Sequence, residues 1–256
     1  MSIQTELTRL TNAKAAIKTA IEGKGVTVPS DTLLDGMASL IESIEAGGGA
    51  TEPYIEEVVD GNGDITNATL HGYTIIRSYA FYNCSKLALA SLSSGITSIG
   101  NYAFYNCSKL ALASLPSGLT SIRNYAFYNC SELALTRLPS GITSIGDNAF
   151  YMCSKLALTS LPSGLTSIRS YAFYNCSKLA LTSLPSGITS IGNNAFYTCS
   201  GLDSLTFEGK PKSISNSAFK GCTNLTTINA PWAPGAVAGA PWGAINATIN
   251  YNFPGA

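Results

Sequence analysis

The sequence predicts a solenoid, a rod of stacked coils of 23 residues each, made of short parallel β-strands and short helical or 3₁₀ turns and preceded by an N-terminal α-helical segment. The ten residues FYNCSKLALA stand unchanged at 81–90 and at 104–113. Four apolar rows recur at the same interval, each with seven members, and they run from Ile76 to Ile214, Phe81 to Phe219, Cys84 to Cys222 and Leu87 to Leu225. A unit this short cannot bury its own apolar face, so successive coils must stack and cover one another.

Each coil contains segments that predict strands, a turn and a helical turn. We expect LALASL and LTSI to form short strands that pair in parallel with the next coil, roughly 4.8 Å away. LPSG at 115–118 predicts a turn, because proline fixes φ and glycine supplies a positive φ. NYAFYNC at 101–107 is too short for an isolated helix, so a single helical or 3₁₀ turn is expected there.

Arginine and glycine alternate at one position of successive coils. The row reads Arg77, Gly100, Arg123, Gly146, Arg169 and Gly192. This alternation indicates that the duplicating unit is a 46-residue pair of coils. The arginines are then expected roughly 10 Å apart along one edge of the rod.

A second leucine row has two open orientations. In the last two coils LDSLTF and LTTINA follow the general L-x-x-L-x-L strand pattern, but in the five earlier coils the second leucine comes one place earlier. If the register is kept, Leu89, Leu112, Leu135, Leu158 and Leu181 face outward as an apolar stripe suited to a partner. A slip of one residue instead buries this row and turns the following Ala or Thr outward.

The two ends of the chain differ from the repeat. Residues 1–46 are expected to form helices, and Ile3, Leu7, Leu10, Ile17 and Ile21 lie on one helical stripe that predicts a homo-oligomer, with a trimer as the expected state. Residues 47–53 are a Gly-rich linker, 54–76 an N-terminal cap, 77–230 the seven coils and 231–256 a C-terminal cap. The cap is expected to cover the last coil with Trp232 and Trp242.

The repeat unit AFYNCSKL…LPSGLTSI resembles the BspA-like leucine-rich repeat over about residues 77–232. This resemblance implies a right-handed leucine-rich-repeat solenoid that serves adhesion or recognition and is not an enzyme. The N-terminal segment IQTELTRLTNAKAAIKTAIEGKGVTVP and the ending APWAPGAVAGAPWGAINATINYNF are similar to tail-fibre and tail-associated proteins of phages that infect gut bacteria.

The composition argues against several functions. The 15 basic and 15 acidic residues cancel, so we expect no nucleic-acid partner. No stretch approaches the roughly 20 apolar residues that span a bilayer, so no membrane insertion is expected, and the first residues lack the pattern of a secretory signal.

No catalytic or metal site is expected, and therefore no cofactor. The single histidine, His71, has no motif around it. The seven cysteines are 23 residues apart and favour a buried ladder over a metal or redox site. The loop DGNGD at 60–64 has some calcium-loop character, but Ile65 stands where that loop requires glycine, so a plain turn is favoured.

Tyrosine is the candidate recognition residue, because it follows the inward phenylalanine of six coils and has a rigid ring with a polar tip. The row is Tyr82, Tyr105, Tyr128, Tyr151, Tyr174 and Tyr197. Leu112, Leu135 and Leu158, in their outward orientation, and Arg137 complete the candidate surface. The alternative for the tyrosines is a ladder that packs on itself, which can still act as a platform.

Two functional hypotheses follow. The main one is a structural component of a phage tail, located in the virion, which contacts other tail proteins and presents the solenoid to a glycan or protein on the host surface. The alternative is a bacterial cell-surface or secreted adhesin that uses the same rod. A hydrolase lacks any acid–base or nucleophile constellation.

Overall fold

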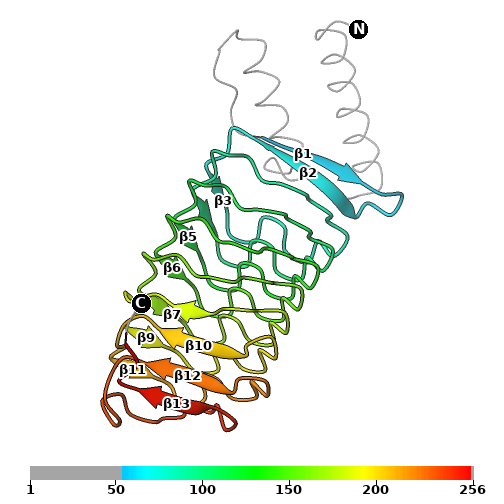
Figure 1. The fold of residues 1–256 in the computed structure, drawn as a ribbon. Helices are drawn as coiled ribbons and strands as arrows, with labels where there is room; N and C mark the ends of the chain where they lie inside the picture. Colours follow the sequence, from blue (N-terminus) through cyan, green and yellow to red (C-terminus); the bar gives the residue numbers. More distant parts are fainter. Residues whose placement is uncertain (1–53, 255–256) are drawn as a thin grey trace, which may run out of the picture. The chain divides into compact units, whose positions relative to one another are not determined.

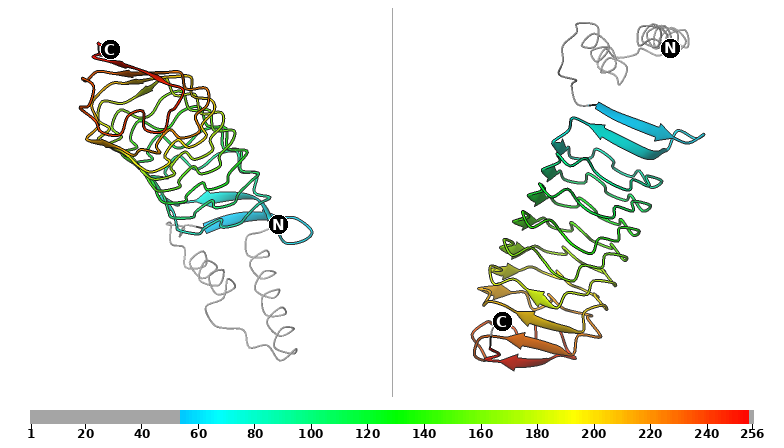
Figure 2. Two further views of the ribbon diagram at one scale, coloured as in Figure 1. Left: turned by 90° about the horizontal axis from the view of Figure 1, so that it is seen from below. Right: turned by 45° about the horizontal axis from the view of Figure 1, so that its top comes forward.

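The structure, a computed structural model, describes residues 54–254 and shows a parallel β-solenoid (Figure 1). The coils follow one another along a rod that runs from an N-terminal hairpin to a C-terminal strand (Figure 2). The fold class predicted from the 23-residue period is confirmed. The predicted helices in 1–46, their oligomerisation residues and the linker 47–53 lie outside the described residues.

A β-hairpin covers the first coil. Its strands, β1 (Tyr54–Val59) and β2 (Ile65–His71), form a two-stranded sheet. Ala68 and Leu70 of β2 are buried in the core. The Ala88 N–H of the first coil donates to the Thr66 carbonyl of β2 at 2.9 Å. Strand β2 thus takes the place of a preceding coil.

One face of the rod is a seven-stranded parallel sheet built from two residues of each coil. Its strands are β3 (Ile75–Ile76), β4 (Ser98–Ile99), β5 (Ser121–Ile122), β6 (Ser144–Ile145), β7 (Ser167–Ile168), β9 (Ser190–Ile191) and β11 (Ser213–Ile214). Each strand pairs with the residues 23 positions along, as Ile99 does with Ile122. The second isoleucine of β3 and the isoleucine of each later strand are buried, and the preceding residue faces outward. The LTSI strands are confirmed.

The LALASL strands form only toward the C-terminal end. A second parallel sheet has the order β13-β12-β10-β8 and contains β8 (Ser183–Leu184), β10 (Ser204–Phe207), β12 (Thr227–Ala230) and β13 (Thr248–Tyr251). In earlier coils two consecutive outward residues, such as Ala113 and Ser114, interrupt the alternation that a strand requires. In the coil that contains β10 the two consecutive outward residues are Asp203 and Ser204, two places earlier in the coil. Inward and outward residues then alternate from Ser204 to Phe207, so a four-residue strand forms.

The leucine row with two open orientations is buried. Its members Leu89, Leu112, Leu135, Leu158 and Leu181 are at most 4% exposed, and the Ala or Thr that follows each of them is exposed. The register is unchanged three residues later, where Leu184 pairs with Phe207. The one-residue shift is therefore confined to the residues around the second leucine. The predicted outward orientation of this leucine row, as an exposed apolar stripe, is wrong.

The LPSG segments form the expected turn, but the backbone conformation of the glycine differs from the expected one. The Leu119 N–H donates to the Pro116 carbonyl at 3.0 Å, which closes a four-residue turn. Gly118 does not have the positive φ that we expected. A type I turn has negative φ at both central residues, so this turn does not need the conformational freedom of glycine.

The NYAFYNC segment is a series of turns and not the expected helical turn. The N–H groups of Tyr102, Phe104 and Asn106 donate to carbonyls of the next coil at 2.8–3.0 Å. The N–H groups of Tyr105 and Cys107 donate within the coil to the residue three positions back. Tyr102 and Asn106 have φ of 55° and 57°, which interrupts any helix. Residues 54–254 contain no helix, and so none that is long and apolar enough to cross a membrane.

The core is a stack of identical layers. The phenylalanine rings of successive coils are parallel, with centroids 5.2–5.5 Å apart. Six cysteine thiols donate to the phenylalanine carbonyl of the preceding coil, as Cys130 does to Phe104 at 3.0 Å. Each buried cysteine therefore acts both as a small apolar residue and as a hydrogen-bond donor.

The C-terminal segment closes the other end of the core. Strand β13 pairs with β12 over four residues. The Phe219 N–H, which has no following coil, donates to the Trp242 carbonyl at 3.0 Å. Trp242 is fully buried, and Trp232 meets the ring of Phe207 edge-on at 5.1 Å. The segment thus supplies both the apolar cover and the acceptor that another coil would supply.

We predict that the native protein exposes a single reactive thiol. Burial raises the pKa of Cys84, but its thiol is only partly buried and can meet a reagent, whereas the other six cysteines are buried. Burial raises the pKa of Cys222 to about 12 and that of Cys130 well above its ordinary value, so these thiols do not form the reactive thiolate. Titration with Ellman's reagent at pH 8 should modify one thiol quickly, and the remaining six only after denaturation. Fast modification of several thiols in the folded protein would contradict this packing.

Candidate recognition surface

The six candidate tyrosines form a continuous stack, here called the long tyrosine ladder. Neighbouring ring centroids are 4.4–5.0 Å apart and neighbouring rings are within 14° of parallel from Tyr82 to Tyr197. Tyr82 is 43% exposed, and the other five rungs are partly buried by their neighbours. The tyrosines therefore pack on themselves and still leave part of each ring at the surface.

A second, short tyrosine ladder runs beside the first. Tyr79, Tyr102 and Tyr125 stack at 5.0 and 4.6 Å, and each leans on the long tyrosine ladder at 5.6–5.9 Å. All three have positive φ, an uncommon conformation for a residue with a side chain. Asn148 and Asn194 hold the same position in two later coils. Asparagine tolerates positive φ more readily than most residues with a side chain. Its tolerance explains why asparagine stands at this position in coils that add no ring to the short tyrosine ladder.

Packing in the long tyrosine ladder raises the pKa of some of its hydroxyl groups. Burial is the main cause that raises the pKa of Tyr105 and of Tyr128 above the ordinary value for tyrosine. Close tyrosine neighbours add to this effect because two nearby phenolates would repel one another. The surface is a strip of aromatic rings, and the neutral hydroxyls of Tyr105 and Tyr128 can both donate and accept hydrogen bonds.

The other members of the predicted surface differ in their exposure to solvent. Leu112, Leu135 and Leu158 are completely buried, so they cannot contact a partner. They point inward because the outward positions are taken by the Ala or Thr that follows each of them. Arg137 is exposed, as predicted, in the LALTRL segment.

Sequence reasoning missed a groove on the outer face of the seven-stranded sheet, here called the arginine groove. It has a volume of about 430 Å³. Its lining includes Arg123, Arg169, Gly146, Asn124, Ser121 and Ser144. The alternation of arginine and glycine in the sequence was the one sign of this groove. That alternation alone does not show that the arginines lie beside the outward serines of the seven-stranded sheet.

Glycine forms the floor of the arginine groove because no side chain fits there. A Cβ atom on Gly146 would lie 2.5 Å from the Asn124 backbone nitrogen and 2.6 Å from the Arg123 carbonyl carbon. Gly100 and Gly192 are in equally close contact with the coil before them. Every second coil therefore approaches its predecessor too closely for any residue with a Cβ atom.

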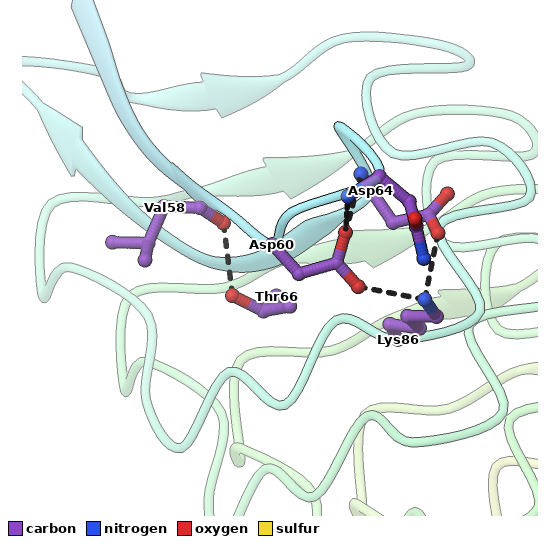
Figure 3. A network of polar contacts seen from close by, with 6 residues as sticks. Val58, Asp60, Asp64, Thr66 and Lys86 are labelled. Carbon is purple, nitrogen blue, oxygen red and sulfur yellow. Dashed lines mark hydrogen bonds and ion pairs between the residues drawn. The ribbon is translucent and has the colours of Figure 1, made fainter.

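The DGNGD loop is the turn of the hairpin, as expected. The Lys86 Nζ lies 2.6 Å from an Asp60 carboxylate oxygen and 2.8 Å from one of Asp64 (Figure 3). The hydrogen bond from Lys86 is the main cause that lowers the pKa of Asp60. The ammonium group thus stands between the two carboxylates, the position that a cation would take, and ties the hairpin to the first coil. His71 contacts Glu56 of β1 at 3.4 Å, which gives it a place in the hairpin.

We predict that Gly146→Ala destabilises the protein while Gly118→Ala does not. The new Cβ at 146 must push two coils apart, and overpacking of this kind costs about 1–3 kcal/mol. A Cβ at 118 meets nothing within 4 Å, so its effect should stay within about 0.5 kcal/mol. Urea unfolding of both variants beside the unaltered protein measures the difference. Equal stabilities would show that the coils are not in close contact at Gly146.

Comparison with known proteins points to one family. The model of the BspA type leucine rich repeat region matches residues 61–179 and 143–233 of this chain. Family and fold are typical of non-enzymatic interaction scaffolds, and nothing shows catalytic activity. No curated protein matches the chain.

Solved structures that are similar to this chain include three leucine-rich repeat proteins. A leucine rich repeat protein of T. pallidum is 29% identical, with a TM-score of 0.55, over 67% of this chain and 88% of that one. A leucine rich cell surface protein from Faecalibacterium prausnitzii A2-165 is 21% identical, with a TM-score of 0.48, over 71% of each chain. A leucine-rich repeat protein from Bacteroides ovatus ATCC 8483 is 15% identical, with a TM-score of 0.35, over 79% of this chain and 98% of that one.

Proposed function

This chain belongs to the BspA type leucine rich repeat family, and from that premise we propose that it is a non-enzymatic adhesin that presents the outer faces of its solenoid to a partner. Its expected place is the bacterial cell surface or the surrounding medium. The observation that carries the proposal is the pair of tyrosine ladders, which is a long, rigid and partly exposed aromatic strip.

The physical case for recognition by the ladders rests on preorganisation. Stacking holds each ring in one orientation, so a partner that binds to the strip loses little further side-chain entropy from the protein. Rigid tyrosines with available hydroxyls suit both sugar rings and protein surfaces. We propose that the partner is a glycan or a protein on a host cell.

We predict that Tyr105→Ala combined with Tyr128→Ala weakens binding to that partner. The two rings lie side by side in the long tyrosine ladder with centroids 4.6 Å apart, so removing both leaves a gap in the strip. Interface tyrosines often contribute about 2 kcal/mol or more, so we expect a loss of roughly tenfold or greater. A glycan array and binding to intact host cells provide the measurements.

The matched control is the double change to phenylalanine at the same positions. It preserves the stack and removes only the hydroxyl groups, so it separates loss of the platform from loss of hydrogen bonds. If the alanine variant binds cells as well as the unaltered protein does, and no glycan is bound, the ladders are a structural feature only.

We also propose that residues 1–46 join copies of the chain into a homo-oligomer. The support is the sequence stripe formed by Ile3, Leu7, Leu10, Ile17 and Ile21.

Light scattering of the full chain should therefore give a multiple of the chain mass, with a trimer expected. A shortened chain that starts at Tyr54 should be a monomer, because it lacks the apolar stripe. Changing Leu7 and Leu10 to Ser in the full chain is the matched control and should also give a monomer. Monomer masses for all three proteins would end this proposal.

The phage-tail role remains a sequence-based hypothesis. It rests on the resemblance of the two end segments, whereas the family match supports the adhesin better. A tail component would be found in purified phage particles and encoded beside tail and lysis genes. Mass spectrometry of such particles would distinguish the two roles.

A further inference from the structure

We propose that the arginine groove binds an acidic polysaccharide that carries one carboxylate on every second sugar. This inference deepens the proposed recognition role, on which it rests, by naming a ligand class. It concerns a different set of residues from the tyrosine ladders, so the two can fail separately.

The first support is the uncompensated positive charge of the groove. Arg123 is exposed and forms no ion pair with any residue between 54 and 254. Among residues 54–254, Arg169 forms one ion pair, with the carboxylate of Asp147 at 4.0 Å, and its side chain is 60% exposed. Two guanidinium groups therefore line one groove with a single acidic neighbour, and guanidinium is well suited to binding a carboxylate through two parallel hydrogen bonds.

The second support is the polar floor between the two arginines. Ser121 and Ser144 place hydroxyl groups there, and Asn124 lies beside them. Gly146 keeps the floor open, because its close contact with the preceding coil excludes any larger residue. A ligand in this groove would meet hydroxyl and amide groups and the bare backbone of Gly146, which favours a sugar over an apolar side chain.

The third support is that part of the arrangement repeats along the rod. A second groove of about 340 Å³ lies one pair of coils further on, with Gly192 at the position of Gly146. It shares Arg169 with the first groove, has no second arginine, and includes Asp147 in its lining. The positive charges thus recur every two coils, or about 10 Å. A ligand that uses both grooves must repeat its own negative charge at the same interval.

This interval distinguishes between polymers. Side chains on one face of an extended peptide recur about every 6.6 Å, which does not match the arginines. The phosphates of one DNA strand recur about every 3.4 Å, so only every third phosphate could meet an arginine and the two between would have no cation. One sugar of an extended glycan is about as long as one coil is thick. Carboxylates on every second sugar therefore recur at the same interval as the arginines of the row.

The test uses the full chain and a fluorescently labelled hyaluronan octasaccharide, which has one carboxylate per disaccharide. Fluorescence polarisation at low salt should show binding that weakens as salt is added. The double variant Arg123→Gln and Arg169→Gln should bind at least about tenfold more weakly. Lys178→Gln, which removes an exposed positive charge outside the groove and outside the candidate surface, should bind as the unaltered protein does. Unchanged thermal unfolding of the variants confirms that they are folded.

Four results would each overturn the proposal. These are no binding of the octasaccharide, equal binding of neutral dextran, binding of polyglutamate or single-stranded DNA as tightly as the glycan, or an equal loss in Lys178→Gln. A failure here would leave cell binding by the tyrosine ladders intact, because that binding is measured with different variants. Loss of cell binding in the ladder variants alone would in turn leave the arginine groove unaffected.

Discussion

Every coil of this protein depends on the next coil for the hydrogen-bond partners of its turn backbone. The Phe104 N–H donates to the Ala126 carbonyl at 2.8 Å, and the equivalent bond recurs in each layer. Buried backbone groups without partners are costly, so a coil that lost its neighbour would be unstable. This one constraint explains the strict 23-residue interval, because a single inserted residue would move the N–H groups away from their acceptors.

The same constraint explains the two ends of the rod. The Ala157 N–H donates to the preceding coil, and the Phe104 N–H donates to the following coil, so each end of the rod needs carbonyl acceptors. The β2 strand provides the Thr66 carbonyl for the first coil, and the C-terminal segment provides the Trp242 carbonyl for Phe219. Lys86 adds an ion pair that holds the hairpin turn in place, although exposed pairs of this kind contribute little stability.

Strict repetition also creates the surface. Because every coil has the same conformation, any residue type that recurs in the sequence becomes a row in space. Tyrosines become ladders, and alternating arginine and glycine become a series of grooves with a two-coil period. Recognition by such a surface favours partners that are themselves extended or periodic, since they can use several rungs at once.

The sequence by itself determined the period, the stacked core of Phe, Cys and Leu, and the strands at LTSI, because these follow from apolar residues at a fixed interval. Tertiary structure alone decided the rest. The orientation of Leu112 depends on which neighbouring residue turns outward, and local alternation allows both choices. The segment around Tyr102 is short enough for one helical turn, but its N–H donates to the next coil instead of within the segment, and its positive φ interrupts a helix. The arginine groove exists because Gly146 touches a residue 22 positions earlier, and such a contact has no signature within one coil.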